Sequence, residues 1–464
     1  MNEFLKLILS ELRGAAGLAV AAAALCAAGI IVAAVIFRLK YKGERKFPLR
    51  QTAVITVFVG YMAALLCLTV LRTSGYSEVN LHLFRAWREA WNSYSFQNCA
   101  NVLLNVAMFI PLGVLLPLVW CAFRRWYAAA GASLLTTLTI ELLQLTTRRG
   151  MFDVDDIFAN FLGAIFGYCI VMAVISAVED GERKVQRTAA YAVVPLLTTA
   201  VIASFFIVYQ IQPYGNLERA ASYRVSTGGS EWKLSCELSD EESSAKIYRA
   251  KTRGKDVCDA LGIAFFHSLG VNENDLGFDY YDAATYISDH MTASVFISHL
   301  DRSCKYNFFK VGGEDAAADR AKIEELLSEY NITVPAGASF IDEGDGWYSF
   351  TLDWEKDGGV AGKLRCKCVV NGGEIMLKQV NDNMTECEYI ADEGIISQRE
   401  AYERMVRGDF AGDFYAYTSH ARVDVISCYP DFEVDSKGYY QPVWRFLVKY
   451  DGLEGETIMI PAIK

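Results

Sequence analysis

A run of nine residues, RRGMFDVDD at 148–156, places five formal charges between two hydrophobic stretches long enough to cross a bilayer. Glu141 lies inside the first stretch, and Asn160 lies inside the second. A charged side chain at membrane depth costs about 2.5–3.5 kcal/mol on insertion scales, so such residues face a bundle interior or a watery cavity. Crowded carboxylates perturb one another's titration, which suits acid–base work or the binding of a cation.

Helical spacing gathers polar side chains along the two stretches that flank this run. Glu141 and Gln144 lie three residues apart near the end of the first stretch. At the start of the second stretch, one helix face carries Asp153, Asp156 and Asn160, which are spaced i, i+3 and i+7. We expect Asp155 to point in a different direction. Arg148 and Arg149 can pair with the carboxylates or bind a lipid phosphate. A self-neutralising structural network is the alternative.

An earlier stretch adds amides to the set. Asn98, Asn101 and Asn105 share one helix face, and Pro111 and Gly113 then bend or break that helix. Two interpretations are open: the asparagines join helices by hydrogen bonds of about 0.6 kcal/mol each, or they line a site. The candidate site residues are therefore Asn101, Asn105, Glu141, Gln144, Arg148, Arg149, Asp153, Asp156 and Asn160.

The first half of the chain predicts a membrane bundle. Stretches of about 20 predominantly apolar residues lie at 17–37, 52–71, 100–120, 126–145, 157–178 and 189–209. Glycines dilute the fifth, so a bundle of five spans is the alternative. Two glycines of this stretch, Gly163 and Gly167, lie on the same helix face as Asn160 and should let another helix approach closely.

Loop charge predicts the orientation. Lysine and arginine concentrate in the loops at 38–51, 121–125 and 179–188, which we expect to be cytoplasmic. The N-terminus and everything after residue 210 then lie outside the cell membrane. A retained first helix is favoured over a cleaved signal peptide, because the strongest basic cluster follows it.

The second half has a different composition. Residues 1–209 hold 18 Lys and Arg against 12 Asp and Glu, whereas residues 210–464 hold 26 against 43. An acidic soluble half argues against a nucleic-acid partner. No Cys-x-x-Cys or His-rich spacing is present, so we expect no metal site and no cofactor. Seven of the twelve cysteines lie here, and this odd number leaves at least one unpaired.

Short β-like runs alternate with helical ones in this half, so its class is α+β. The clearest helices are 315–330 and 397–408, the second opening with Ser397 and Glu400 in the spacing of a capping box. We expect a linker at 210–235 and an extracellular domain at 236–464. Turns rich in Asp and Gly, DEGDGW and EKDGG, favour hairpins.

Three motifs in the bundle resemble the VanZ-like family. They are NLHLFR at 80–85, NVLLNVAMFIPLGVLLPL at 101–118 and ELLQLTTRRGMFDVDDIFANFLGAIFGY at 141–168. The resemblance covers about residues 50–178 and implies a link to teicoplanin-type glycopeptide resistance, without a defined reaction. By resemblance, the family's polar signature includes Asn105, Pro111, Glu141, Gln144, Arg149, Asp153, Asp156 and Asn160.

The C-terminal tail is similar to PepSY or two-component-regulator domains, as a helix followed by antiparallel strands. Two such units are expected, at about 315–390 and 391–464. This resemblance implies a binding or inhibitory module outside the cell.

We therefore expect an integral membrane protein with a helical bundle at 1–209 and an extracellular domain after it. Two functions are considered for this architecture. In the first, an outer-leaflet polar pocket engages an envelope lipid or a lipid-linked cell-wall precursor. In the second, the bundle is an anchor and the protein is a sensor or scaffold whose extracellular domain binds a protein or peptide.

Overall fold

The fold is that of a computed structural model, which describes residues 28–32, 34–40, 48–70, 79–148, 150–179, 181–218, 220–251, 254–271, 276–280, 283–288, 292–354, 358–411, 422–451 and 453–464. The chain divides into two compact units. The first, called the membrane unit here, comprises Met1–Trp87 and Asn98–Gln212; the second, the sheet unit, comprises Arg88–Gln97 and Pro213–Lys464.

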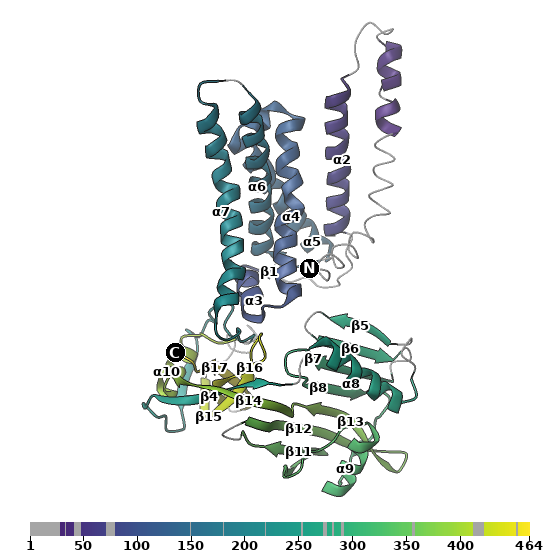
Figure 1. Ribbon diagram of the computed structural model, residues 1–464, viewed down its shortest axis with the longest axis vertical. Helices are drawn as coiled ribbons and strands as arrows, with labels where there is room; N and C mark the ends of the chain where they lie inside the picture. The colour runs from purple at the N-terminus through teal and green to yellow at the C-terminus, as the bar shows by residue number, and fades with distance from the viewer. Residues whose placement is uncertain are drawn as a thin grey trace. The chain divides into compact units, whose positions relative to one another are not determined.

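Five helices in the described residues are long and apolar enough to cross a membrane. They are α2 (Leu49–Val70), α4 (Phe96–Val119), α5 (Trp126–Thr147), α6 (Val154–Val178) and α7 (Lys184–Ile211) (Figure 1). A 3-10 turn at Cys121–Arg124 joins α4 to α5, and α3 (Arg85–Ser93) precedes α4. These five match five of the predicted stretches, including the glycine-diluted fifth.

Five of the six predicted spans are shown in the described residues, and the sixth stays a prediction. The first predicted stretch, 17–37, lies mostly outside the described residues; 28–32 and 34–40 are helical. Apolar length alone predicted that span.

Glycines allow α4 and α6 to touch backbone to backbone. A Cβ on Gly163 would lie 1.9 Å from the carbonyl oxygen of Val106, and one on Gly167 would lie 2.1 Å from that of Ile110. On α4, a Cβ on Gly113 would lie 1.8 Å from the carbonyl oxygen of Ala164. The prediction that Gly163 and Gly167 admit a close helix is confirmed, and the helix that approaches is α4.

Replacing Gly163 by Ala should therefore destabilise the membrane unit by about 1–3 kcal/mol, because the backbone oxygen facing it cannot move aside. Gly131 of α5 is the matched control, since nothing lies within 4 Å of its Cβ position. Gly131→Ala should stabilise by up to about 1 kcal/mol through helix propensity. Thermal unfolding in detergent measures both; equal effects of the two variants would contradict the close approach.

The sheet unit contains fifteen strands in its described residues, joined in one sheet. The strands are β3 (Glu231–Leu234), β4 (Ser243–Ala250), β5 (Leu276–Tyr280), β6 (Ala283–Ser288), β7 (Ala293–Ser298), β8 (Cys304–Phe308), β9 (Glu314–Asp315), β10 (Ser339–Gly344), β11 (Trp347–Leu352), β12 (Gly358–Asn371), β13 (Glu374–Asp382), β14 (Thr385–Ile395), β15 (Arg422–Val434), β16 (Tyr439–Tyr450) and β17 (Leu453–Pro461). The main path runs β3-β15-β16-β4-β14-β12-β13-β8-β7-β6-β5. Pairing is antiparallel except between β3 and β15.

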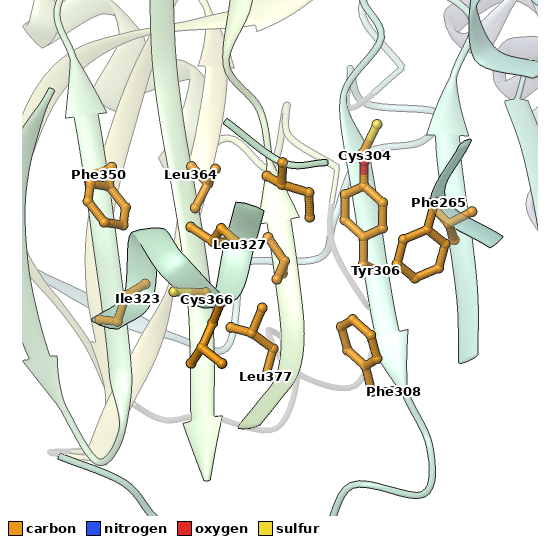
Figure 2. Packing of buried hydrophobic residues seen from close by; sticks show 14 of the residues in the cluster. Phe265, Cys304, Tyr306, Phe308, Ile323, Leu327, Phe350, Leu364, Cys366 and Leu377 are labelled. Atoms are coloured by element: carbon orange, nitrogen blue, oxygen red, sulfur yellow. The ribbon is translucent and has the colours of Figure 1, made fainter. Parts of the chain in front are cut away.

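Three helices cover this sheet and create two main cores. Helices α8 (Lys255–Ser268) and α9 (Arg320–Glu329) bury Phe265 and Leu327 against β7, β8 and β11 to β13. Figure 2 shows Ile323 and Leu327 of α9 beside Cys366 and Leu377 of the strands. Helix α10 (Gln398–Val406) packs with β15, β16 and β17 around the second core. This is the predicted α+β class; α8 was not predicted.

Local signals in the tail hold only in part. The hydroxyl of Ser397 accepts the backbone N–H of Glu400 at 3.1 Å, which is one half of the capping box. The carboxylate of Glu400 instead pairs with Arg404, 2.8 Å away, because the exposed guanidinium offers it a charged partner. The DEGDGW turn does join two strands, β10 and β11. The EKDGG turn begins at 355–357, outside the described residues.

The predicted linker is held to the sheet unit along part of its length. The backbone N–H of Gly215 donates to the carboxylate of Asp435 at 2.6 Å. The backbone N–H of Asn216 donates to the hydroxyl of Ser436, and the backbone N–H of Ser436 donates to the carbonyl oxygen of Asn216, both at 2.9 Å. Asp435 is fully buried. Burial raises the pKa of its carboxyl group, and the N–H donors around it act in the opposite direction. Asp435 therefore fixes the point where the chain enters this unit.

A short segment from between α2 and α4 also belongs to the sheet unit. The side-chain amide of Asn92 donates to the carbonyl oxygen of Ala220 at 3.0 Å, and that of Asn216 donates to Trp91 at 2.7 Å. Four described membrane-length helices separate this segment from Pro213. An even number of crossings returns the chain to the same side, so both segments lie on one side of the membrane. Which side that is stays a prediction from loop charge.

All seven cysteines of the sheet unit are free. Five of them are buried: Cys258, Cys304, Cys366, Cys368 and Cys387. They fill core space as small apolar side chains.

Candidate functional site

The NLHLFR motif reaches the start of α6 through a two-residue parallel bridge. Strand β1 (Val79–Asn80) pairs with β2 (Phe152–Asp153), and Asn80 lies opposite Asp153. The amide of Asn80 donates to both carboxylate oxygens of Asp153 at 3.1 Å. Asp153 is also the N-cap of α6, accepting the backbone N–H of Asp155 at 2.8 Å. Both oxygens of Asp153 are thus used in holding this corner together.

Asp155 binds the backbone of the same motif. Its carboxylate accepts the N–H of Phe84 at 2.5 Å and the N–H of Ala86 at 2.6 Å, and the residue is 2% exposed. Phe84 has a φ of 66°, a left-handed conformation that costs a bulky residue of order 1–3 kcal/mol. Asp155 therefore fixes a strained turn at the start of α3, and its partners differ from the amide of Asn105 that contacts Asp156.

A polar stripe runs between the antiparallel helices α5 and α6. The amide of Asn160 donates to the hydroxyl of Thr137 at 3.1 Å. One turn further along α5, the carboxylate of Glu141 accepts the backbone N–H of Asp153 at 3.2 Å. This register places Glu141 at the same level as Asp156 along the contact between α5 and α6. We call Glu141 and Asp156 the carboxylate pair.

A third helix contributes to the carboxylate pair. The amide of Asn105, from α4, donates to Asp156 at 2.5 Å. Glu141 is 1% exposed, and Asp156 is partly buried. Each carboxylate therefore has one neutral hydrogen-bond donor, and no ion pair involves either of them in the described part of the chain. Two acidic groups so close together in an apolar setting cannot both stay charged without a proton or a cation.

Two amide oxygens near the pair have no hydrogen-bond partner. Asn160 is 4% exposed, and its Oδ1 is buried and unpaired, one turn deeper on the face of α6 that carries Asp156. The Oε1 of Gln144 is also buried and unpaired, while its Nε2 donates to the carbonyl oxygen of Thr69 on α2 at 3.0 Å. Buried polar atoms without partners are rare in folded proteins, so each calls for an occupant.

The structure brings six of the nine candidate residues into this network: Asn105, Glu141, Gln144, Asp153, Asp156 and Asn160. Asn101 is exposed, and no hydrogen bond given for the described residues joins it to this network, so its assignment stays a prediction. Arg148 is exposed at the C-terminal end of α5, and Arg149 lies outside the described residues.

Sequence reasoning missed two members of the network, Asn80 and Thr137. Thr137 lies four residues before Glu141, hence on the same helix face, and that spacing could have identified it. Asn80 was visible as the first residue of NLHLFR, but its partner on α6 lies 73 positions away.

No group of three or more His, Cys, Asp or Glu side chains suited to a metal ion is found in the described residues. Any ion at the carboxylate pair would therefore depend on amide or water oxygens for its remaining ligands.

Residues 58–176 match the VanZ/LLP1 family. The matched segment begins within α2 and ends within α6, so it contains most of the network around the carboxylate pair. It is about a quarter of the chain, and it ends before α7 and the sheet unit. The VanZ/LLP1 match therefore gives no support to the PepSY resemblance of the tail. No curated protein matches the chain.

Asp155→Ala should destabilise the membrane unit by about 2 kcal/mol, because two backbone N–H groups lose a charged acceptor. Glu179→Gln is the matched control at the other end of α6, where the carboxylate pairs with exposed Arg124 at 3.3 Å. That change should cost about 0–1 kcal/mol. Unfolding in detergent, followed by circular dichroism, compares the two; an Asp155→Ala variant as stable as Glu179→Gln would show that the turn does not depend on Asp155.

Proposed function

We propose that the VanZ-like segment forms a membrane site for the polar headgroup of an envelope lipid or a lipid-linked cell-wall precursor. The carboxylate pair, Glu141 and Asp156, is the group that contacts the ligand. Through this contact the protein raises tolerance to teicoplanin-type glycopeptides. The orientation that loop charge predicts puts the site toward the outer leaflet, where such precursors are used.

One observation supports this proposal above the others. Asp153 and Asp155 each accept two or more hydrogen bonds that hold the NLHLFR motif and the start of α6, whereas Glu141 and Asp156 accept one each. A purely structural network would tie off every carboxylate, since an unpaired charge in an apolar interior costs several kcal/mol. An unsatisfied pair in a membrane segment is a functional-site hypothesis by default.

A second line of support is the way three helices of the matched segment meet at the pair. Asn105 of α4, Glu141 of α5 and Asp156 of α6 converge although they are far apart in sequence. A site on several rigid helices holds its groups more precisely than one on loops. The arrangement suits ligand binding that must discriminate between headgroups.

Glu141→Gln and Asp156→Asn, each in the full-length chain, should abolish most of the teicoplanin tolerance that the unaltered protein confers. Each change removes a charged contact worth about 1.5–3 kcal/mol, which is roughly tenfold or more in ligand affinity. The measurement is the tolerated antibiotic concentration in a host that lacks the protein, at matched membrane levels.

Glu182→Gln serves as the control for this experiment, because Glu182 is an exposed carboxylate in the loop before α7. It should leave tolerance unchanged. Full tolerance in both carboxylate-pair variants would reject the proposed site. Loss in all three variants would point to an effect on expression or folding.

A further inference from the structure

The unpaired oxygens around the carboxylate pair form a cluster composed of acceptors. It comprises the carboxylates of Glu141 and Asp156, together with the Oδ1 of Asn160 and the Oε1 of Gln144, which lie one helical turn from them on α6 and α5; we call it the acceptor cluster. Asn105 and the backbone of Asp153 donate one hydrogen bond each to the two carboxylates. Ionised carboxylates can only accept, and the amide nitrogens of Asn160 and Gln144 already donate elsewhere.

The charge of the acceptor cluster is uncompensated. No lysine, arginine or histidine forms an ion pair with Glu141 or Asp156 in the described residues, and Arg148 is exposed. Helices α4, α5 and α6 contribute the neutral side chains of Asn105, Thr137 and Asn160, and the carboxylates of Asp153 and Asp155 add further negative charge beside the pair. A buried negative charge without a partner is strongly unfavourable, so a proton or a positive group must complete the site.

We propose that the acceptor cluster binds a cationic group, either an alkali cation or the primary ammonium of a lipid headgroup. This rests on the proposed function and narrows it, because it assigns the carboxylate pair to the positive part of the ligand. Hard cations and ammonium groups both take oxygen ligands from carboxylates and amides. A phosphate would meet only acceptors here and is excluded from the cluster.

The experiment uses the full-length protein purified in detergent, with thermal unfolding as the readout. Phosphatidylethanolamine offers a primary ammonium, phosphatidylcholine offers a cation that cannot donate, and phosphatidylglycerol offers none. In a separate arm, sodium chloride replaces N-methylglucamine chloride in the absence of lipid. A ligand that binds only the folded state raises the midpoint, by roughly 3 °C or more near saturation.

We expect phosphatidylethanolamine to raise the midpoint and phosphatidylglycerol to leave it unchanged. If sodium alone gives the full increase and phosphatidylethanolamine adds nothing, the cationic group is a free ion. In Glu141→Gln the increase should disappear while the ligand-free midpoint rises, because a neutral amide relieves the uncompensated charge. Glu182→Gln should keep the increase.

The inference is overturned if phosphatidylglycerol is as effective as phosphatidylethanolamine, or if the increase survives in Glu141→Gln. A phosphatidylglycerol effect that Glu141→Gln abolishes would reject cation binding and still leave a lipid site at the pair. If neither lipid nor sodium changes the midpoint, cation binding by the acceptor cluster is also rejected. The proposed function is tested separately, by the tolerance experiment.

Discussion

Two carboxylates on neighbouring membrane helices, Glu141 and Asp156, lie at the same level of the contact between α5 and α6, and no ion pair involves either of them in the described residues. In an apolar interior this arrangement is unfavourable unless a proton or a cation completes it. The rest of the membrane unit is organised so that the pair nevertheless holds its position. Gly163 and Gly167 bring α4 into backbone contact with α6, which lets the short side chain of Asn105 reach Asp156.

Local geometry divides the aspartates of the charged run between structural roles and the candidate site. Asp153 caps α6 and holds Asn80, and Asp155 holds the strained turn at Phe84. Acidic residues at a helix N-terminus also interact favourably with its dipole, so both carboxylates are stabilised where they lie. Asp153 and Asp155 connect the NLHLFR motif to the motif at 141–168. The carboxylate pair is therefore the part of the acidic set that can contact a ligand.

Much of this could be predicted from the sequence. Hydrophobic length located five membrane helices, and helical spacing selected Glu141, Asp156 and Asn160 because both signals are local. Features that depend on how the helices pack could not be predicted. The hydrogen bonds from Asn80 to Asp153 join residues far apart in sequence, and the exposure of Asn101 depends on which helices lie beside α4. The sheet unit shows the same limit, since its strands were visible as runs but their order, with β3 parallel to β15, was not.

The central claim is that Glu141 and Asp156 interact directly across α5 and α6, and a double-mutant cycle measures this. The free energies of unfolding of Glu141→Gln, Asp156→Asn and the double variant are compared with that of the unaltered protein. Direct interaction predicts that the double variant departs from the sum of the singles by about 0.5–3 kcal/mol. Additivity of the two changes would contradict the account.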